Sequence, residues 1–323
     1  MRLLPALLSA LTLFLGAPMH ASAQGYPTKS IRIVHGFGSG GPVDLLARML
    51  APVLSERLGQ PVLVEGKPGA GGTLGAAFVA KSDPDGYTLL LMAAGHAAAP
   101  GLYRSLPYDA AGDFTMISMV ARSPYAIIAG PASPASSMQE LVQKARAQPG
   151  KIDYGSPGVG SGMHLMAVLL QARAGIQLSH IPYKTATAVN LAVMGGEIPV
   201  LFTSVAGITP LMESGKVKML AVTSKERYAL LPGVPTVAET VLPEFDVTSW
   251  YALAAPKNLP APIVAQLNEA VLIALKRPDV VERLRTQAIE VFPSTPRVAQ
   301  DLLGSEVARW TKVVRDEKIP PQD

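Results

Sequence analysis

The segment from Ile31 to Arg48 constrains the fold more than any other part of the chain. A β-branched run is followed by a turn rich in glycine and then by Pro42, at the first turn of an expected amphipathic helix, where proline is tolerated. Such a turn leaves backbone N–H groups pointing outward beside the positive end of a helix dipole. It suits an anion, and we expect it to hold a carboxylate.

Short apolar runs alternate with helical patterns from this segment onward. Strands are expected at 31–34, 62–65 and 87–92, and helices at 43–58 and 73–81. This order predicts a mostly parallel sheet with helices on both faces. Because ligands bind beyond the carboxyl ends of the strands in such sheets, the loops that follow these strands are candidate binding segments.

The alternation of strands and helices starts again after residue 113. The expected strands are 114–120, 125–129, 152–154, 180–183, 199–203, 217–223 and 249–254; helices are expected to end near 147 and 174, and to span 262–276, 279–287 and 295–318. The segments 93–100 and 223–243 are expected to be a loop and a series of turns.

Residues 1–23 have the features of a signal peptide. Arg2 precedes an apolar run, and Ala21-Ser22-Ala23 supplies the small residues that a signal peptidase reads. The apolar run is about 14 residues long, short of the roughly 20 that a membrane-spanning helix needs. We expect cleavage after Ala23 and a soluble periplasmic protein. The chain has no cysteine, so neither a lipid anchor nor a disulfide is expected.

The expected mature chain of about 300 residues suits two domains better than one. Segments near 121–124 and 247–255 have the character of crossovers between two lobes. We predict a first lobe formed by residues 24–122 and 248–323, with a second lobe, residues 123–247, inserted into it.

The charge distribution gives no sign of nucleic-acid binding. The chain has 28 lysine and arginine residues against 24 acidic ones, and the basic residues stand singly or in pairs. Binding of nucleic acid would require clustered basic residues with interleaved aromatic residues. We interpret the charges as a solvated surface and expect no nucleic-acid partner.

A second glycine-rich loop runs from Gly155 to His164, between an expected strand and an expected helix. It carries hydroxyl groups at Ser156 and Ser161. Two such loops, one from each lobe, can close on one small anion. The alternative interpretation is that Ser161 only caps the following helix. Tyr183 and Lys184 could offer a phenol and an ammonium group to an acid, or could simply flank a loop.

The segment Gly36–Gly41 also satisfies the dinucleotide-binding pattern G-x-G-x-x-G, and Glu65 ends the next strand, near the place of a ribose-binding acid. Export through a signal without twin arginines argues against this interpretation, because nicotinamide cofactors are not supplied outside the cytoplasm. A further alternative is that the glycines only permit tight turns. We expect no cofactor.

The histidines beyond residue 23 form no recognisable metal or catalytic motif. No two of them stand at i, i+3 or i+4 with an acidic neighbour, as a zinc site would favour. No G-x-S-x-G elbow is present either. We therefore expect no metal and no catalytic residue. His96 follows the third expected strand and can face the cleft, although a solvated loop histidine is the commoner case.

Many motifs in a fixed order identify a family. They are Tyr26-Pro27, Ile31-Arg32-Ile33-Val34, Gly40-Gly41, Asp44, Ala47-Arg48, Leu58-Gly59-Gln60-Pro61-Val62, Lys67-Pro68-Gly69-Ala70-Gly71-Gly72, Asp83-Pro84-Asp85-Gly86-Tyr87-Thr88-Leu89, Leu106-Pro107-Tyr108-Asp109, Ile181-Pro182-Tyr183-Lys184, Leu220-Ala221-Val222-Thr223-Ser224, Val234-Pro235-Thr236 and Ser249-Trp250. With these motifs the chain resembles the periplasmic solute-binding receptors of tripartite tricarboxylate transporters, the Bug or TctC-like family, over residues 26–318.

The resemblance implies an α/β, type II periplasmic-binding-protein fold: two doubly wound lobes, joined by two crossover segments, that close on a small carboxylate. It also implies a monomeric receptor that is not an enzyme and that delivers its ligand to the permease subunits of a tripartite tricarboxylate-type transporter. In similar receptors the two glycine-rich turns bind one carboxylate through backbone N–H groups and ordered water. The candidate ligand-binding residues are Phe37, Gly38, Ser39, Gly40, Gly41, His96, Ser156, Gly158, Val159, Gly160, Ser161, His164, Tyr183, Thr185 and Thr203.

The sequence departs from the family pattern at several of these positions. Glycine and serine stand in the first turn where prolines are common, and Thr185 follows Lys184 where a small glycine is usual. Thr203 stands where an acid is frequent, so an amino group would be recognised less well and amino-acid ligands are disfavoured. Dicarboxylates, citrate-like tricarboxylates, aromatic acids and nicotinate-like acids remain open.

Two other functions remain open at this point. One is an exported enzyme, a hydrolase or a dehydrogenase, on the same α/β scaffold. The other keeps the fold but assigns signalling, with the closed receptor presenting its surface to a membrane sensor.

Overall fold

The structure is a computed structural model of the 323-residue chain, and it describes residues 25–206, 208–316 and 319–321. The predicted signal peptide, residues 1–23, lies outside the described residues. Within the part that is described, the helices are too short or too polar to cross a membrane.

The chain folds into alternating strands and helices. The strands are β1 (Ile31–His35), β2 (Val62–Gly66), β3 (Thr88–Ala93), β4 (Phe114–Ala129), β5 (Asp153–Ser156), β6 (Ser179–Pro182), β7 (Val200–Ser204), β8 (Lys218–Val222), β9 (Thr248–Pro256) and β10 (Glu290–Val291). The helices are α1 (Pro42–Leu58), a 3₁₀ turn η1 (Ala70–Gly72), α2 (Thr73–Ala80), α3 (Gly95–Leu102), α4 (Met138–Ala147), α5 (Gly162–Ala174), α6 (Ala186–Gly195), α7 (Thr209–Glu213), α8 (Val237–Thr240), α9 (Ala261–Lys276), α10 (Pro278–Thr286) and α11 (Pro296–Asp316).

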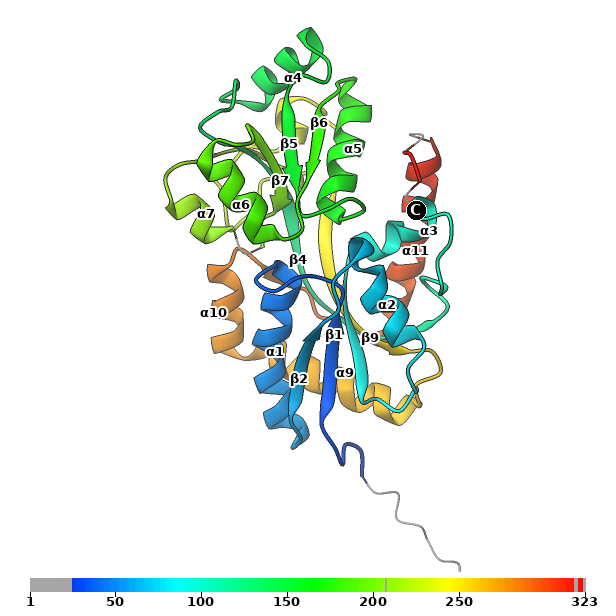
Figure 1. Ribbon diagram of the computed structural model, residues 1–323. Coiled ribbons are helices and arrows are strands. Elements are labelled where there is room, and N and C mark those ends of the chain that lie inside the picture. The colour runs from blue at the N-terminus through cyan, green and yellow to red at the C-terminus, as the bar shows by residue number, and fades with distance from the viewer. Residues whose placement is uncertain (1–24, 207, 317–318, 322–323) are drawn as a thin grey trace, which may run out of the picture.

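The strands form two groups that share β4. The first group has the order β2-β1-β3-β9-β4, in which β1, β2 and β3 are parallel and β9 is antiparallel to its neighbours. The second group continues from β4 through β7 and β5 to β6, with β8 also paired to β4. Figure 1 shows the first group below and the second above, with β4 running between them.

The expected strands 114–120 and 125–129 are one continuous strand, β4, so the predicted break at Ser123-Pro124 is wrong. Up to Pro124 the strand pairs with β9, and from Tyr125 it pairs with β7 and β8. Proline has no N–H group to donate to a ladder. It is tolerated here because the strand changes partners at this residue. The predicted lobe boundaries fall inside β4 and immediately before β9.

Apolar faces of the helices cover the sheet. In α1 the residues Leu46, Leu50 and Leu54 recur at helical spacing, and they pack with α9 residues such as Val271 against the strands of the first group. Gly59 ends α1 in the left-handed conformation, with φ +70°, which a glycine adopts without strain.

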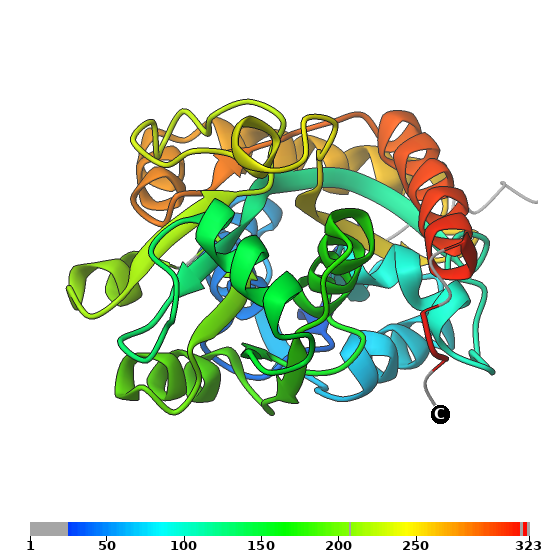
Figure 2. The same ribbon diagram turned by 90° about the horizontal axis from the view of Figure 1, so that it is seen from above.

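Helix α3 replaces the predicted loop at 93–100. Gly95, Pro100 and Gly101 resemble helix breakers, but tertiary packing outweighs their low helix propensity. A methyl group built on Gly101 would lie 3.0 Å from Cβ of Val314 in α11, so the glycine allows the two helices to approach closely. Figure 2 shows α11, in red, lying beside the cyan α3 at one end of the molecule.

The C-terminal helix α11 also fixes the start of β9. The Glu306 carboxylate accepts hydrogen bonds from the indole Nε1 of Trp250 and of Trp310, each at 3.3 Å. Arg309 Nη2 donates to the carbonyl oxygen of Asp246 at 3.1 Å. Helix α11 therefore holds the second connection between the two strand groups in place.

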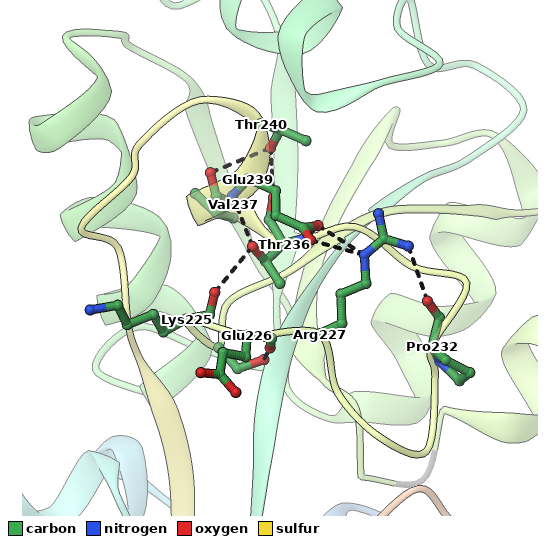
Figure 3. A network of polar contacts seen from close by, with 9 residues as sticks. Lys225, Glu226, Arg227, Pro232, Thr236, Val237, Glu239 and Thr240 are labelled. Atoms are coloured by element: carbon green, nitrogen blue, oxygen red, sulfur yellow. Dashed lines mark hydrogen bonds and ion pairs between the residues drawn. The ribbon is translucent and has the colours of Figure 1, made fainter.

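The turn-rich segment 223–243 is held by the capping box of α8 (Figure 3). The Thr236 hydroxyl accepts from Glu239 N at 2.9 Å, and Glu239 Oε2 accepts from Thr236 N at 2.9 Å. Arg227 Nε donates to the Glu239 carboxylate at 3.0 Å. The hydrogen bonds from Thr236 N and Arg227 hold the pKa of Glu239 below its ordinary value, so its carboxylate is ionised at neutral pH.

Candidate ligand-binding site

A cavity of about 530 Å³ lies between the two groups of strands. Its volume is within the usual range for small-molecule sites, roughly 300–1,000 Å³. Both glycine-rich turns, after β1 and after β5, face this one space. The lining residues lie in the segments 36–43, 68–72, 93–95, 157–163 and 183–186, together with Tyr125, Ser249 and Tyr251.

The predicted site residues divide into two sets. Phe37, Gly38, Gly41, Gly158, Val159, Ser161, Tyr183 and Thr185 line the cavity. Ser39, Gly40, His96, Ser156, Gly160, His164 and Thr203 do not line it. Ser39 and Gly40 are exposed on the outer side of the first turn, and Thr203 is buried in β7. The role of the first set in ligand binding stays a prediction.

Some lining residues were not among the predicted site residues. The glycine-rich turn Gly69–Gly72 follows β2 at the same edge of the sheet as the first turn, so its loop was a candidate binding segment, but none of its residues was named. Tyr125, Ser249 and Tyr251 come from the interiors of β4 and β9, where no turn or motif marks them.

Asp44 fixes the first glycine-rich turn from inside α1. Its carboxylate accepts hydrogen bonds from Gly40 N and from Arg48 Nε, both at 3.0 Å. His35 Nε2 lies 3.2 Å from Asp44 Oδ1, and His35 Nδ1 accepts from Phe37 N at 3.4 Å. Because Nδ1 accepts, the ring proton is on Nε2, which donates to Asp44. The turn is therefore held by protein contacts alone.

The protonation states of this pair follow from its surroundings. Burial acts to raise the pKa of the Asp44 carboxyl, but hydrogen bonds from Arg48 and Gly40 outweigh it and leave the pKa below its ordinary value. Burial lowers the pKa of His35, with Asp44 acting in the opposite direction. At neutral pH Asp44 is ionised and His35 is neutral, as the tautomer requires.

Ser161 holds the second glycine-rich turn. Its hydroxyl donates to the Gly158 carbonyl oxygen at 2.7 Å and accepts from His164 N at 3.3 Å, which caps α5. Gly160 N donates to His164 Nδ1 at 3.3 Å. The single hydroxyl proton of Ser161 is used within the turn. Backbone N–H groups, not this hydroxyl, are therefore the donors that the turn can present to a ligand.

Two histidines pack behind the second turn. The rings of His164 and His180 stack with centroids 4.4 Å apart, and His180 stacks on Tyr154 at 4.8 Å. The Ser156 hydroxyl lies 2.8 Å from His180 Nε2. Burial lowers the pKa of both histidines to about 4, so neither carries a positive charge at neutral pH.

His96 lies in the core and not in the cleft. Its Nε2 donates to the Ala110 carbonyl oxygen at 2.8 Å, and its ring stacks on Tyr108 with centroids 5.6 Å apart. Burial lowers the pKa of His96 to about 4. The residue is 8 % exposed, so it matches neither sequence expectation, a cleft-facing histidine or a solvated one. Helix α3 turns the side chain inward.

Three residues that carry hydroxyl groups, Tyr125, Ser249 and Tyr251, line the floor of the cavity where β4 meets β9. The Tyr251 hydroxyl lies 3.1 Å from Ser204 Oγ, which lies 3.1 Å from Ser123 Oγ. The Tyr125 and Tyr251 side chains also interact with Ser249. Burial raises the pKa of both tyrosines, so their hydroxyls stay protonated and neutral. The two tyrosines therefore contribute no charge to the cavity lining.

Five helices begin at the cavity wall. Their N-caps or first residues are Gly41 for α1, Gly72 for α2, Gly95 for α3, Ser161 for α5 and Thr185 for α6, and all five line the cavity. The first N–H groups of a helix have no carbonyl partner within it, and they carry the positive end of the helix dipole. The cavity therefore favours a negative charge.

Few charged side chains reach this space. Lys184 is the one lysine, arginine, aspartate or glutamate among the described lining residues. The described part of the chain also has no group of three or more histidine, aspartate and glutamate residues placed to hold a metal ion.

The parallel strands, the shared strand β4 and a cavity between two lobes define the class of protein. It is a two-lobed α/β solute-binding protein.

Comparison with known proteins identifies the family. The family described as tripartite tricarboxylate transporter family receptor matches residues 46–319. The periplasmic binding protein BugD is 34% identical with a TM-score of 0.86, covering 92% of this chain and 100% of BugD. R. palustris Rpa4515, solved with adipate, is 33% identical with a TM-score of 0.87, covering 92% of this chain and 100% of that one. MatC from Rhodopseudomonas palustris, with bound malate, is 32% identical with a TM-score of 0.85, covering 90% of this chain and 100% of MatC.

The chain belongs to the family of tripartite tricarboxylate transporter receptors. It is a solute receptor for a transporter, and the predicted two-lobed α/β fold of the periplasmic binding proteins is confirmed.

Proposed function

We propose that the protein captures a small carboxylate by closing its two lobes, and that it delivers this ligand to the permease subunits of a tripartite tricarboxylate-type transporter. The observation that carries the proposal is the convergence of five helix N-termini on a cavity in which Lys184 is the one charged lining residue among those described. Adipate in Rpa4515 and malate in MatC support a carboxylate.

Neutral donors suit this task energetically. Backbone N–H groups at helix N-termini are already oriented, and pairing them with a carboxylate does not require a buried cation to be desolvated. The Asp44 network in the first turn and Ser161 in the second hold these groups in place. Binding is reversible and involves no covalent step, so the protein acts as a receptor and not as an enzyme.

The ligand lacks an ammonium group. Thr203, the residue on which the sequence argument rested, is buried in β7 and does not line the cavity. None of the described lining residues is an aspartate or a glutamate that could pair with an ammonium group. A buried ammonium group without a paired carboxylate would be costly.

The remaining features of the proposal follow from the sequence. The signal peptide, residues 1–23, is cleaved after Ala23, and the monomeric protein works in the periplasm. The lobes comprise residues 24–122 with 248–323, and residues 123–247. A membrane sensor would be a further partner if the receptor also signals.

A thermal-shift screen of the mature protein tests the proposal. The acids are succinate, malate, adipate, citrate, benzoate and nicotinate, with succinamide, benzamide and aspartate as matched controls. An acid present at 100 times its dissociation constant should add about 2.7 kcal/mol to the unfolding free energy, a shift of several degrees. Stabilisation by the amides, with none by the six acids, would contradict a carboxylate ligand. Stabilisation by aspartate would contradict a ligand without an ammonium group. Consumption of a bound acid, followed by NMR, would favour an exported enzyme.

A further inference from the structure

Tyr103 lies where the two lobes touch beside the cavity. It follows α3 in the first lobe, and its hydroxyl oxygen would be 2.8 Å from a methyl group built on Gly160, in the second-lobe turn. A methyl group built on Gly71 of the first lobe would lie 3.1 Å from this oxygen, and also 3.1 Å from the carbonyl carbon and oxygen of Gly160. Tyr103 itself does not line the cavity.

The contact is between the hydroxyl end of the half-buried Tyr103 side chain and bare backbone. Methyl–oxygen distances below 3.0 Å are essentially not observed, so a side chain at Gly160 would require the Tyr103 phenol or the second-lobe turn to move. Nearby, a methyl group on Gly95 would lie 3.1 Å from Gly162 N, so the turn is also close to the first lobe at its other end. The phenol therefore abuts the turn that presents N–H groups to the cavity.

We propose that Tyr103 is a positioning residue that limits how far the lobes close and thereby places the Gly158–Gly162 turn around the carboxylate. This inference rests on the proposed function. Closure by hinge motion brings the second-lobe turn toward the first lobe until it meets the phenol. Burial raises the pKa of the Tyr103 hydroxyl, so the contact carries no negative charge that would repel an anionic ligand at neutral pH.

Gly160→Ala tests the contact directly. The methyl group meets the Tyr103 oxygen and should hold the lobes apart, so binding of an acid should weaken at least tenfold. Gly196→Ala is the matched control, because Gly196 has the same φ, +78°, but a methyl group there has only the Ala132 Cβ near it, at 3.9 Å. The control carries the same backbone strain and should change the affinity less than twofold.

Rescue separates this steric contact from a general loss of structure. In the double variant Gly160→Ala/Tyr103→Phe, the new methyl group would face ring carbons at 3.6 and 3.8 Å, which are ordinary contact distances. The double variant should bind at least fivefold more tightly than Gly160→Ala alone. Failure of Tyr103→Phe to restore binding, or wild-type affinity in Gly160→Ala, would overturn the inference.

The lobe separation is measured independently of the ligand. The chain has no cysteine, so spin labels at Lys81→Cys and Lys151→Cys, both exposed and on opposite lobes, report one distance. Electron paramagnetic resonance should show a longer distance in Gly160→Ala than in Gly196→Ala, and recovery in the double variant. If no acid in the screen stabilises the wild-type protein, the proposed function fails. The spin-label distances would still test the positioning role of Tyr103. An unchanged distance between the labels in Gly160→Ala would refute that role.

Discussion

The hydroxyl of Ser161 acts within its own turn, because it donates to Gly158 and accepts from His164. Ser161→Ala should remove the α5 cap, at a cost of about 1 kcal/mol in the unfolding free energy. It should weaken binding of the acid that stabilises the protein most in the thermal-shift screen by a similar free energy, because the turn loses its shape. Urea unfolding and calorimetry measure the two effects. Ser39→Ala, in the exposed part of the first turn, is the control and should change each by less than about 0.5 kcal/mol. Equal effects of Ser161→Ala and Ser39→Ala would contradict the role of the Ser161 hydroxyl in holding its turn.

Single residues of the site were predictable to different degrees. Gly38 and Gly158 follow strands within glycine-rich turns, so a local pattern marks them. Tyr125 and Tyr251 lie inside strands, where alternation shows only that a residue faces one side of the sheet. That their side chains meet at the cavity floor depends on the pairing of β4 with β9, which no local pattern encodes.

At the scale of elements, the second turn should be sensitive to acid. The pKa of His164 is about 4 in the folded protein, against an ordinary value of 6.5. Between these values the unfolded chain binds more protons than the folded one. Titration of His164 therefore does not reduce the unfolding free energy above about pH 6.5. As the pH falls from 6.5 toward 4 it lowers the unfolding free energy, by on the order of 3 kcal/mol at most. His180, stacked on His164, contributes with the same sign.

His164→Asn should reduce this acid sensitivity. The asparagine amide oxygen can take the place of Nδ1 as the acceptor for Gly160 N, but it does not titrate. Unfolding free energies between pH 7.5 and 4.5 should therefore fall less steeply in the variant than in the wild-type protein. The slopes are compared, because loss of the ring contact with His180 lowers stability at every pH. Parallel slopes would show that His164 does not titrate with unfolding.

The capping box of α8 gives an element-scale prediction away from the site. Thr236→Ala removes the acceptor of Glu239 N and should lower the unfolding free energy by about 1 kcal/mol. The dissociation constant for the acid identified by the thermal-shift screen should not change, because neither residue lines the cavity. Urea unfolding and calorimetry provide both values. Thr248→Ala, at an exposed position, is the control; a loss of stability as large as that of Thr236→Ala would count against the cap.

The order of elements was predictable, because apolar periodicity is a local signal. The predictions failed where tertiary contacts decide. Helix α3 contains Gly95, Pro100 and Gly101, which resemble a loop until α11 packs against them. In β4, Pro124 resembles a break until the change of pairing partners is known.

At the scale of the whole molecule, the sequence indicated two lobes but not how closely they meet. In the structure the N-termini of α1 and α6, one from each lobe, meet at the wall of the cavity. A methyl group built on Gly41 would lie 4.0 Å from Cβ of Ala186. Cβ atoms in disulfides are separated by roughly 3.5–4.5 Å, so the two positions are within reach of a disulfide. Gly41 has φ −83°, which any residue adopts, and the chain has no cysteine to compete.

A disulfide between Gly41→Cys and Ala186→Cys should therefore hold the two lobes together. An acid cannot enter a cavity whose lobes do not separate. The oxidised double variant should therefore bind the acid identified by the thermal-shift screen, measured by calorimetry, at least tenfold more weakly or more slowly than the wild-type protein. Reduction with dithiothreitol should restore binding. The control pair is Ala132→Cys with Gly196→Cys, at 3.9 Å and both within the second lobe, which should bind equally well oxidised and reduced. Full and rapid binding by the oxidised Gly41→Cys/Ala186→Cys protein would mean that ligand entry does not require the lobes to separate.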